Sequence, residues 1–133
     1  MTPARQRDWL RLARTENVGP VTFQQLIKRY QTAGAALEAL PDLARQGGRL
    51  SSLTIPSADE IDAELAAGAA LGGRLLTGVD AAFPVQLAAL DPPPPVLWVL
   101  GDPALLARPS VAVVGARIAS AAGQRFARGL AHD

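Results

Sequence analysis

The chain contains 133 residues, 49% of them hydrophobic and 5% aromatic, and carries a formal net charge of +1 at pH 7. This length suits one ordinary domain or two small ones. The near-neutral charge excludes a nucleic-acid binder that relies on a global basic field, so any such role requires a local patch. The absence of cysteine excludes disulfides, thiol catalysis and a cysteine-based zinc site.

No apolar run reaches the roughly 18 residues that a membrane helix needs, and the start of the chain lacks a signal-peptide pattern. We therefore expect a soluble, cytoplasmic protein without a membrane span. Because alanine supplies much of the hydrophobic content, the core is expected to be mostly helical and closely packed.

The first half of the chain predicts a series of short helices. Apolar residues recur at helical spacing over residues 4–15 and 21–30, and a shorter helix is expected over 35–40, before Pro41. A fourth helical piece is expected to end at Gly47–Gly48. Ser57 and Glu60 form a capping-box pattern, which opens a further helix that ends at Gly72–Gly73.

The turn between the first two helices contains Asn17-Val18-Gly19. A turn of this kind is typical of helix-hairpin-helix modules, in which backbone N–H groups at a helix start hold one phosphate without reading bases. Asn17 is acceptable where glycine is usual, because asparagine enters the left-handed conformation more easily than most residues. The candidate secondary DNA contact comprises Asn17, Gly19, Lys28 and Arg29. The alternative is an ordinary turn in a small helical bundle.

After Gly73 the pattern changes from helical to strand-like. Residues 74–77, 96–100 and 111–115 predict strands, separated by short helical pieces and by a stiff polyproline spacer over 91–95. We expect a domain boundary near 70–74, which divides the chain into a helical domain over 1–72 and a second domain over 73–133. The expected fold class is α/β: small N-terminal helices followed by the beginning of a Rossmann-like parallel sheet, incomplete in this chain, which we expect to be the front of a longer protein.

The last predicted strand leads into the most informative motif. Residues 110–115 form an apolar run without polar alternation, as in a strand covered on both faces of a parallel sheet. Gly115 permits a sharp turn or a close approach to a ligand, and Ser120 is a good N-cap for a helix that starts at Ala121. The free N–H groups of that helix and the guanidinium of Arg117 together predict a phosphate site.

This candidate phosphate-binding site comprises Gly115, Ala116, Arg117 and Ser120. Its spacing matches neither the dinucleotide fingerprint nor a P-loop. The alternative is a tight strand-to-helix connection with a solvated arginine.

Nothing in the sequence predicts catalysis. Three aspartates lie beside glycine or proline, where aspartate commonly bonds its own backbone: Asp80, Asp91 and Asp102. Without paired carboxylates, a catalytic triad or a metal-ligand cluster, we expect no catalytic residue, no metal and no cofactor. His132 is interpreted as a solvated helix residue. Trp9 and Trp98 are interpreted as core residues, with base stacking as the alternative.

The second half of the chain carries a longer pattern of glycine, proline, aspartate and apolar positions. In order, it consists of Gly78-Val79-Asp80, Phe83-Pro84, Leu87, Leu90-Asp91-Pro92-Pro93, Leu97, Gly101-Asp102, Leu105, and Val111 to Arg117 with Ser120 and Gly123. This succession closely resembles the DNA-processing protein A family (DprA, also called Smf). The N-terminal helices resemble the sterile-alpha-motif or helix-hairpin-helix-like domain that precedes the Rossmann-like core of that family.

The resemblance implies a bacterial, non-enzymatic protein that binds single-stranded DNA without sequence preference. It implies a role in natural transformation, in which the protein protects incoming DNA and loads the RecA recombinase onto it, and a homodimer in the complete protein. The Gly-Ser/Thr-Arg turn of the family, whose arginine contacts DNA phosphate, falls on Gly115, Ala116 and Arg117. Ala116 departs from the usual hydroxyl residue and so removes one phosphate donor.

Two other functions remain open from the residues alone. A Rossmann-like nucleotide hydrolase would place a nucleoside monophosphate on the same helix start, because a fold by itself does not decide function. Alternatively, residues 1–70 form an interaction domain for protein or DNA; we expect this half to bind little or no DNA by itself.

Overall fold

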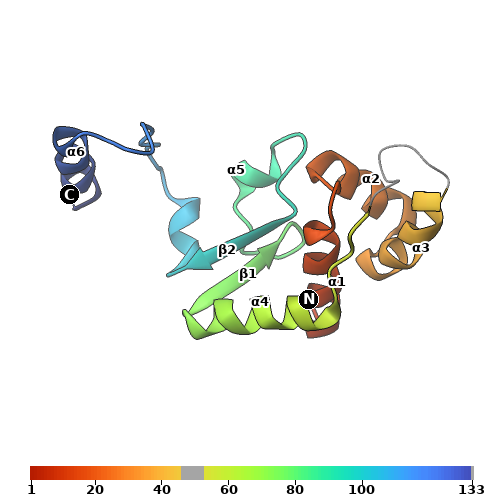
Figure 1. Cartoon of the computed structure of the whole chain (residues 1–133). Coiled ribbons are helices and arrows are strands. Elements are labelled where there is room, and N and C mark those ends of the chain that lie inside the picture. The colour runs from red at the N-terminus through yellow and green to blue at the C-terminus, as the bar shows by residue number, and fades with distance from the viewer. Residues whose placement is uncertain (46–52, 133) are drawn as a thin grey trace.

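The computed structural model describes residues 1–45 and 53–132 (Figure 1). Among the described residues, the first part of the chain contains four helices: α1 (Pro3–Arg14), α2 (Pro20–Tyr30), α3 (Ala33–Arg45) and α4 (Ala58–Ala70). After them come β1 (Gly73–Thr77), α5 (Val85–Ala88), β2 (Val96–Leu100), the 3-10 helix η1 (Pro103–Ala107) and α6 (Ala121–His132). A helical domain followed by a small sheet region is the mixed architecture that the sequence predicts.

Local signals set most helix starts. The Ser57 hydroxyl accepts from the N–H of Glu60, and the Glu60 carboxylate accepts from the N–H of Ser57, so the expected capping box opens α4. Gly72 follows α4 in the left-handed region at φ 73°, which favours glycine. The expected helix end at Gly47–Gly48 lies outside the described residues.

The expectation that a helix ends before Pro41 is wrong, because α3 continues through Pro41 to Arg45. Proline removes one backbone donor from the helix ladder. Leu40 is fully buried before Pro41, and Leu43 packs against the same core after it. Burial on both sides of the proline outweighs the lost hydrogen bond.

One hydrophobic core lies among α1, α2 and α3. Its buried members are Leu12, Val18, Phe23, Leu26, Ala33, Ala36, Leu37 and Leu40. A second core joins Leu10 of α1 to Ile61 of α4 and Leu75 of β1, with Trp98 of β2 packed against it. Helix α1 therefore contributes to both cores, so apolar packing crosses the position at which we expect the domain boundary.

Strands β1 and β2 form a two-stranded antiparallel sheet, with Leu75 opposite Trp98 and Thr77 opposite Val96. The expectation of a parallel sheet is therefore wrong for these strands. Parallel neighbours need a crossover that carries the chain back to the same end of the sheet. The connection between β1 and β2 contains only the four-residue α5 and returns the chain in the opposite direction.

The expected third strand over 111–115 is also wrong. These residues form no strand, and Val111 and Val114 are 85% and 91% exposed. An extended segment becomes a strand only when a neighbour pairs with its backbone groups, and within the described residues β1 and β2 pair only with each other. The helix expected from Ala121 is confirmed as α6, which Figure 1 shows at the far end of the molecule, beyond this extended segment.

Candidate nucleic-acid interface

The start of α6 has the cap that the sequence predicts. The Ser120 hydroxyl accepts from the N–H of Gly123 at 3.2 Å, and the Ser120 carbonyl accepts from the N–H of Gln124 at 2.9 Å. The hydroxyl is thus occupied by its own helix. The N–H groups of Ala121 and Ala122, in the first turn, have no partner among the described residues. These two amides remain available to an acceptor from outside.

Arg117 lies three residues before Ser120, in a bend of the exposed segment that leads into α6. Its side chain is exposed and makes no ion pair or hydrogen bond within the part of the chain that the structure describes. A Cβ at Gly115 would contact nothing within 4 Å, so packing against the described residues does not require glycine there. The four predicted site residues thus share one exposed segment, without a strand behind them.

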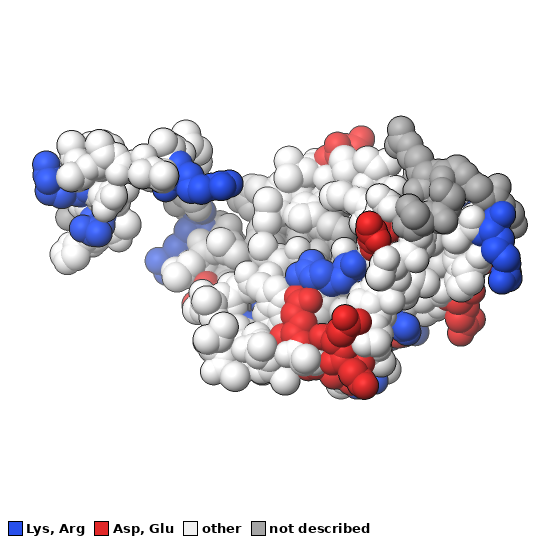
Figure 2. Space-filling view, in the orientation of Figure 1, with Lys and Arg blue, Asp and Glu red and all other residues white. Residues whose placement is uncertain are grey.

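Charge is distributed unevenly along the chain. Residues 103–132 contain four arginines and no aspartate or glutamate, whereas residues 1–72 contain eight basic and eight acidic side chains. The arginines of the basic region are Arg108, Arg117, Arg125 and Arg128. In Figure 2 the charged side chains visible over α6 and the segment that enters it are blue, and the remaining residues there are mostly white. Arg125 and Arg128 stand three positions apart on α6 and so share one of its faces. The total charge of the chain conceals these two arginines, whereas a charge count by region reveals them.

The secondary contact that the sequence predicts is divided between the two ends of α2. Asn17 has φ 62°, which confirms the expected left-handed conformation, and Gly19 is the N-cap of α2 in extended conformation. Lys28 and Arg29 lie in the last turn of the same helix. At 1.5 Å per residue, about 14 Å of helix axis separates Gly19 from Lys28. A single phosphate therefore does not reach both groups.

Two of the three aspartates that lie beside glycine or proline accept hydrogen bonds within turns. The Asp80 carboxylate accepts from the N–H and the hydroxyl of Thr77, each at 2.8 Å, and Asp102 accepts from the N–H of Ala104 at 2.9 Å. No group of three or more His, Cys, Asp or Glu side chains that could hold a metal ion exists among the described residues. Over the same residues, no helix has the length and apolar character needed to cross a membrane.

The two tryptophans are partly buried and hydrogen-bonded. The indole N–H of Trp9 donates to the carbonyl of Pro95 at 2.7 Å, and that of Trp98 donates to the carboxylate of Glu64 at 2.9 Å. Arg14 donates twice to the same carboxylate, at 2.8 and 3.0 Å. These bonds lower the pKa of Glu64 against the opposing effect of partial burial, with the Arg14 hydrogen bond as the largest cause.

Comparison with known proteins identifies two matching family models. The DprA-like N-terminal HHH domain matches residues 3–67, and the DNA recombination-mediator protein A model matches residues 74–133. The first covers α1 to α4, and the second covers the sheet region, the exposed segment and α6. No curated protein matches the chain.

Proposed function

The chain belongs to the DNA recombination-mediator protein A (DprA) family, and from this premise we propose that it binds single-stranded DNA without sequence preference and loads RecA recombinase onto it. The setting is the processing of DNA taken up in natural transformation, and the complete protein is a cytoplasmic homodimer. Residues 1–72 form its helical domain and residues 73–133 the first part of its DNA-binding domain.

The main support for the proposal is Arg117, an exposed cation beside the start of α6. Arg117 has no competing acidic partner among the described residues, and the N–H groups of Ala121 and Ala122 are unoccupied. A phosphate oxygen bound there would accept from the guanidinium and from the amides together. Neither donor reads a base, so the contact is independent of sequence.

The basic region extends this contact along α6. Arg125 and Arg128 are exposed on the helix that Arg117 precedes, and no acidic side chain occurs between residues 103 and 132. A single strand that binds at the start of α6 meets further positive charge as its backbone continues. Affinity that depends on such contacts falls steeply as salt rises, because each bound phosphate releases counterions.

Replacing Arg117 tests the proposal directly. In the complete protein, Arg117→Ala is expected to weaken single-strand binding to the same degree on homopolymer and mixed sequences. The slope of log K against log salt should become shallower by about 0.7, because one phosphate contact is lost. Fluorescence anisotropy with labelled oligonucleotides at several salt concentrations measures both quantities.

Arg45→Ala is the matched control, because Arg45 is an exposed arginine of the helical domain that pairs with Asp42. It should leave affinity and salt slope unchanged. If Arg117→Ala binds as tightly as the unaltered protein at low salt, Arg117 does not have the role proposed here. RecA loading follows from the same contact, so Arg117→Ala should also fail to accelerate RecA filament assembly on single strands.

The nucleotide hydrolase is the alternative use of the same helix start. Incubation of the complete protein with nucleotides, followed by chromatography for released base, separates the two functions. Release of base that depends on Arg117 would favour the hydrolase.

A further inference from the structure

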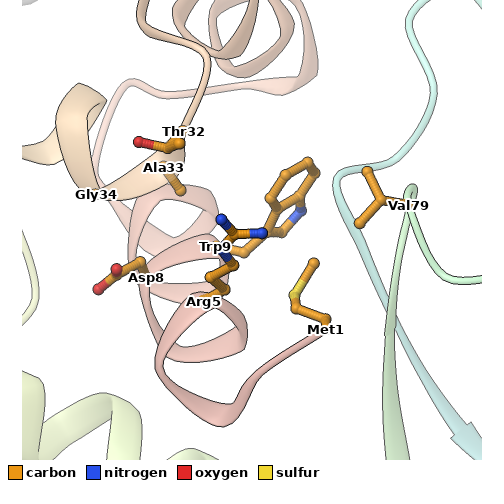
Figure 3. Close-up of a pocket in the computed structure, with 8 residues that line it drawn as sticks. All are labelled: Met1, Arg5, Asp8, Trp9, Thr32, Ala33, Gly34 and Val79. Atoms are coloured by element: carbon orange, nitrogen blue, oxygen red, sulfur yellow. The ribbon is translucent and has the colours of Figure 1, made fainter.

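A cavity of about 540 Å³ lies between the start of α1, the start of α3 and the turn after β1. Trp9 and Arg5 of α1 line it, with Met1 and Val79 across from the indole ring (Figure 3). Its volume is within the roughly 300–1,000 Å³ of sites for small molecules. The residues that line this cavity include none from the start of α6 and none from the Asn17 turn.

The indole ring of Trp9 is held in place from two sides. Its N–H donates to the carbonyl of Pro95 at 2.7 Å, and the ring of Phe23 packs against it with centroids 5.1 Å apart, tilted by 59°. The ring nevertheless lines the cavity. A fixed aromatic ring loses little conformational entropy when a flat partner stacks on it, which makes it an efficient binding surface.

Arg5 supplies a positive charge at the same cavity. Its side chain is exposed and has no ion pair or hydrogen bond within the described residues. Asp8, one turn along α1, also lines the cavity but forms no ion pair with Arg5. In Figure 3 the Asp8 carboxylate points away from Trp9, and its Oδ2 lies 3.1 Å from the position that a Cβ of Gly34 would occupy. Asp8 thus lies at the start of α3, where the helix dipole favours a negative charge.

We propose that this cavity receives one unpaired base of single-stranded DNA, stacked on Trp9, with the adjoining phosphate on Arg5. The proposal rests on the proposed function. Stacking on an aromatic ring beside a cation suits a single strand of any sequence, because every base has a flat face. Val79 belongs to the turn after β1, so residues 1–70 alone lack one wall of the cavity. This agrees with the expectation that the helical half binds little DNA by itself.

One variant at each of two exposed valines tests the cavity without replacing Trp9. Val79→Glu places a negative charge at the rim and should lower the affinity for a single-stranded oligonucleotide about fivefold or more, which corresponds to loss of one stacked base. The matched control is Val85→Glu on α5; Val85 is 73% exposed, against 65% for Val79, and lies outside the cavity. Val85→Glu should bind within about twofold of the unaltered chain. Arg5→Ala is expected to weaken binding, and Arg45→Ala is not.

Fluorescence reports on the base itself. The chain has two tryptophans, so Trp98→Phe leaves Trp9 as the sole reporter. Titration of this variant of the full chain with an oligonucleotide should quench Trp9 with the midpoint that anisotropy gives, since a stacked base contacts the indole directly. Circular dichroism checks that the variant is folded.

The outcomes separate the two proposals. If the oligonucleotide binds without quenching Trp9, and Val79→Glu binds like Val85→Glu, the base site is wrong while the proposed function stands. If the unaltered chain binds no oligonucleotide even at low salt, the proposed function fails for this chain. The cavity is then tested alone by titrating Trp98→Phe with deoxyadenosine monophosphate: quenching supports a base site, and constant fluorescence overturns it.

Discussion

Gly68 illustrates how one missing side chain determines packing. It lies on α4 beneath the indole ring of Trp98, and a Cβ added at Gly68 would come within 2.2 Å of a ring carbon. Real Cβ atoms do not approach so closely. Helix propensity alone favours alanine over glycine by about 1 kcal/mol, so the close contact with the ring opposes the intrinsic preference of the helix. Glycine here allows the indole ring of Trp98, which belongs to β2, to pack directly on α4.

We therefore predict that Gly68→Ala destabilises the protein by about 1–3 kcal/mol, the cost of overpacking, despite its better helix propensity. The control is Gly129→Ala on α6, where a Cβ meets nothing within 4 Å. Gly129→Ala should leave the melting temperature unchanged or raise it. Thermal unfolding followed by circular dichroism measures both variants, and a Gly68→Ala protein as stable as the unaltered chain would contradict the packing argument.

At the level of elements, the Glu64 carboxylate links three of them. It accepts two hydrogen bonds from Arg14 of α1 and one from Trp98 of β2, while Glu64 itself lies on α4. Because these donors favour the charged carboxylate, the pKa of Glu64 is below its ordinary value of 4.5 in the folded chain. The unfolded chain loses the donors and binds a proton more readily. The stabilisation is therefore complete above pH 4.5 and is lost as pH falls through the lower, folded pKa.

Glu64→Gln should consequently lower the unfolding free energy at neutral pH by about 1 kcal/mol. The unfolding free energy of this variant should also decrease less than that of the unaltered chain as the pH falls. Denaturant unfolding across the acidic range compares the variant with the unaltered chain. Glu38→Gln is the control, since Glu38 is an exposed glutamate of α3. Identical acid profiles for Glu64→Gln and the unaltered chain would show that the carboxylate does not couple these elements.

Elements whose signal is local were predictable from the sequence. The Ser57 box, the left-handed Asn17 and the Ser120 cap depend on residues within a few positions of each other, and the structure confirms all three. Strand pairing depends on distant partners, so the antiparallel register of β1 and β2 and the unpaired state of residues 111–115 did not follow from apolar content. The cavity at Trp9 was not predictable for the same reason, because Arg5 and Val79 are far apart in the sequence and line one cavity only in the folded chain.

At the scale of the whole molecule, a net charge of +1 conceals a division into a balanced helical half and a purely basic region over 103–132. The attraction between a protein and a polyanion depends on the position of the protein's charges as well as on its net charge. At ordinary salt, charges more than about 10 Å away are largely screened, so the nearby charges determine the attraction. Some charges of the balanced half are paired internally, as Arg7 with Asp62 and Arg14 with Glu64, whereas Arg5 has no ion pair among the described residues. The basic region itself contains no acidic residue, so under the proposed function we expect a nucleic-acid backbone to bind along α6.

The double variant Arg125→Gln/Arg128→Gln tests this division. If both arginines bind phosphate, the slope of log K against log salt for a single strand should become shallower by about 1.4, twice the contribution of one contact. The double variant Arg7→Gln/Arg45→Gln removes the same charge from the helical half, where both arginines pair with aspartates. Anisotropy titrations over a salt series compare the two proteins of equal net charge. Equal slopes would mean that total charge governs binding; a shallower slope for the α6 variant alone would locate the strand along that helix.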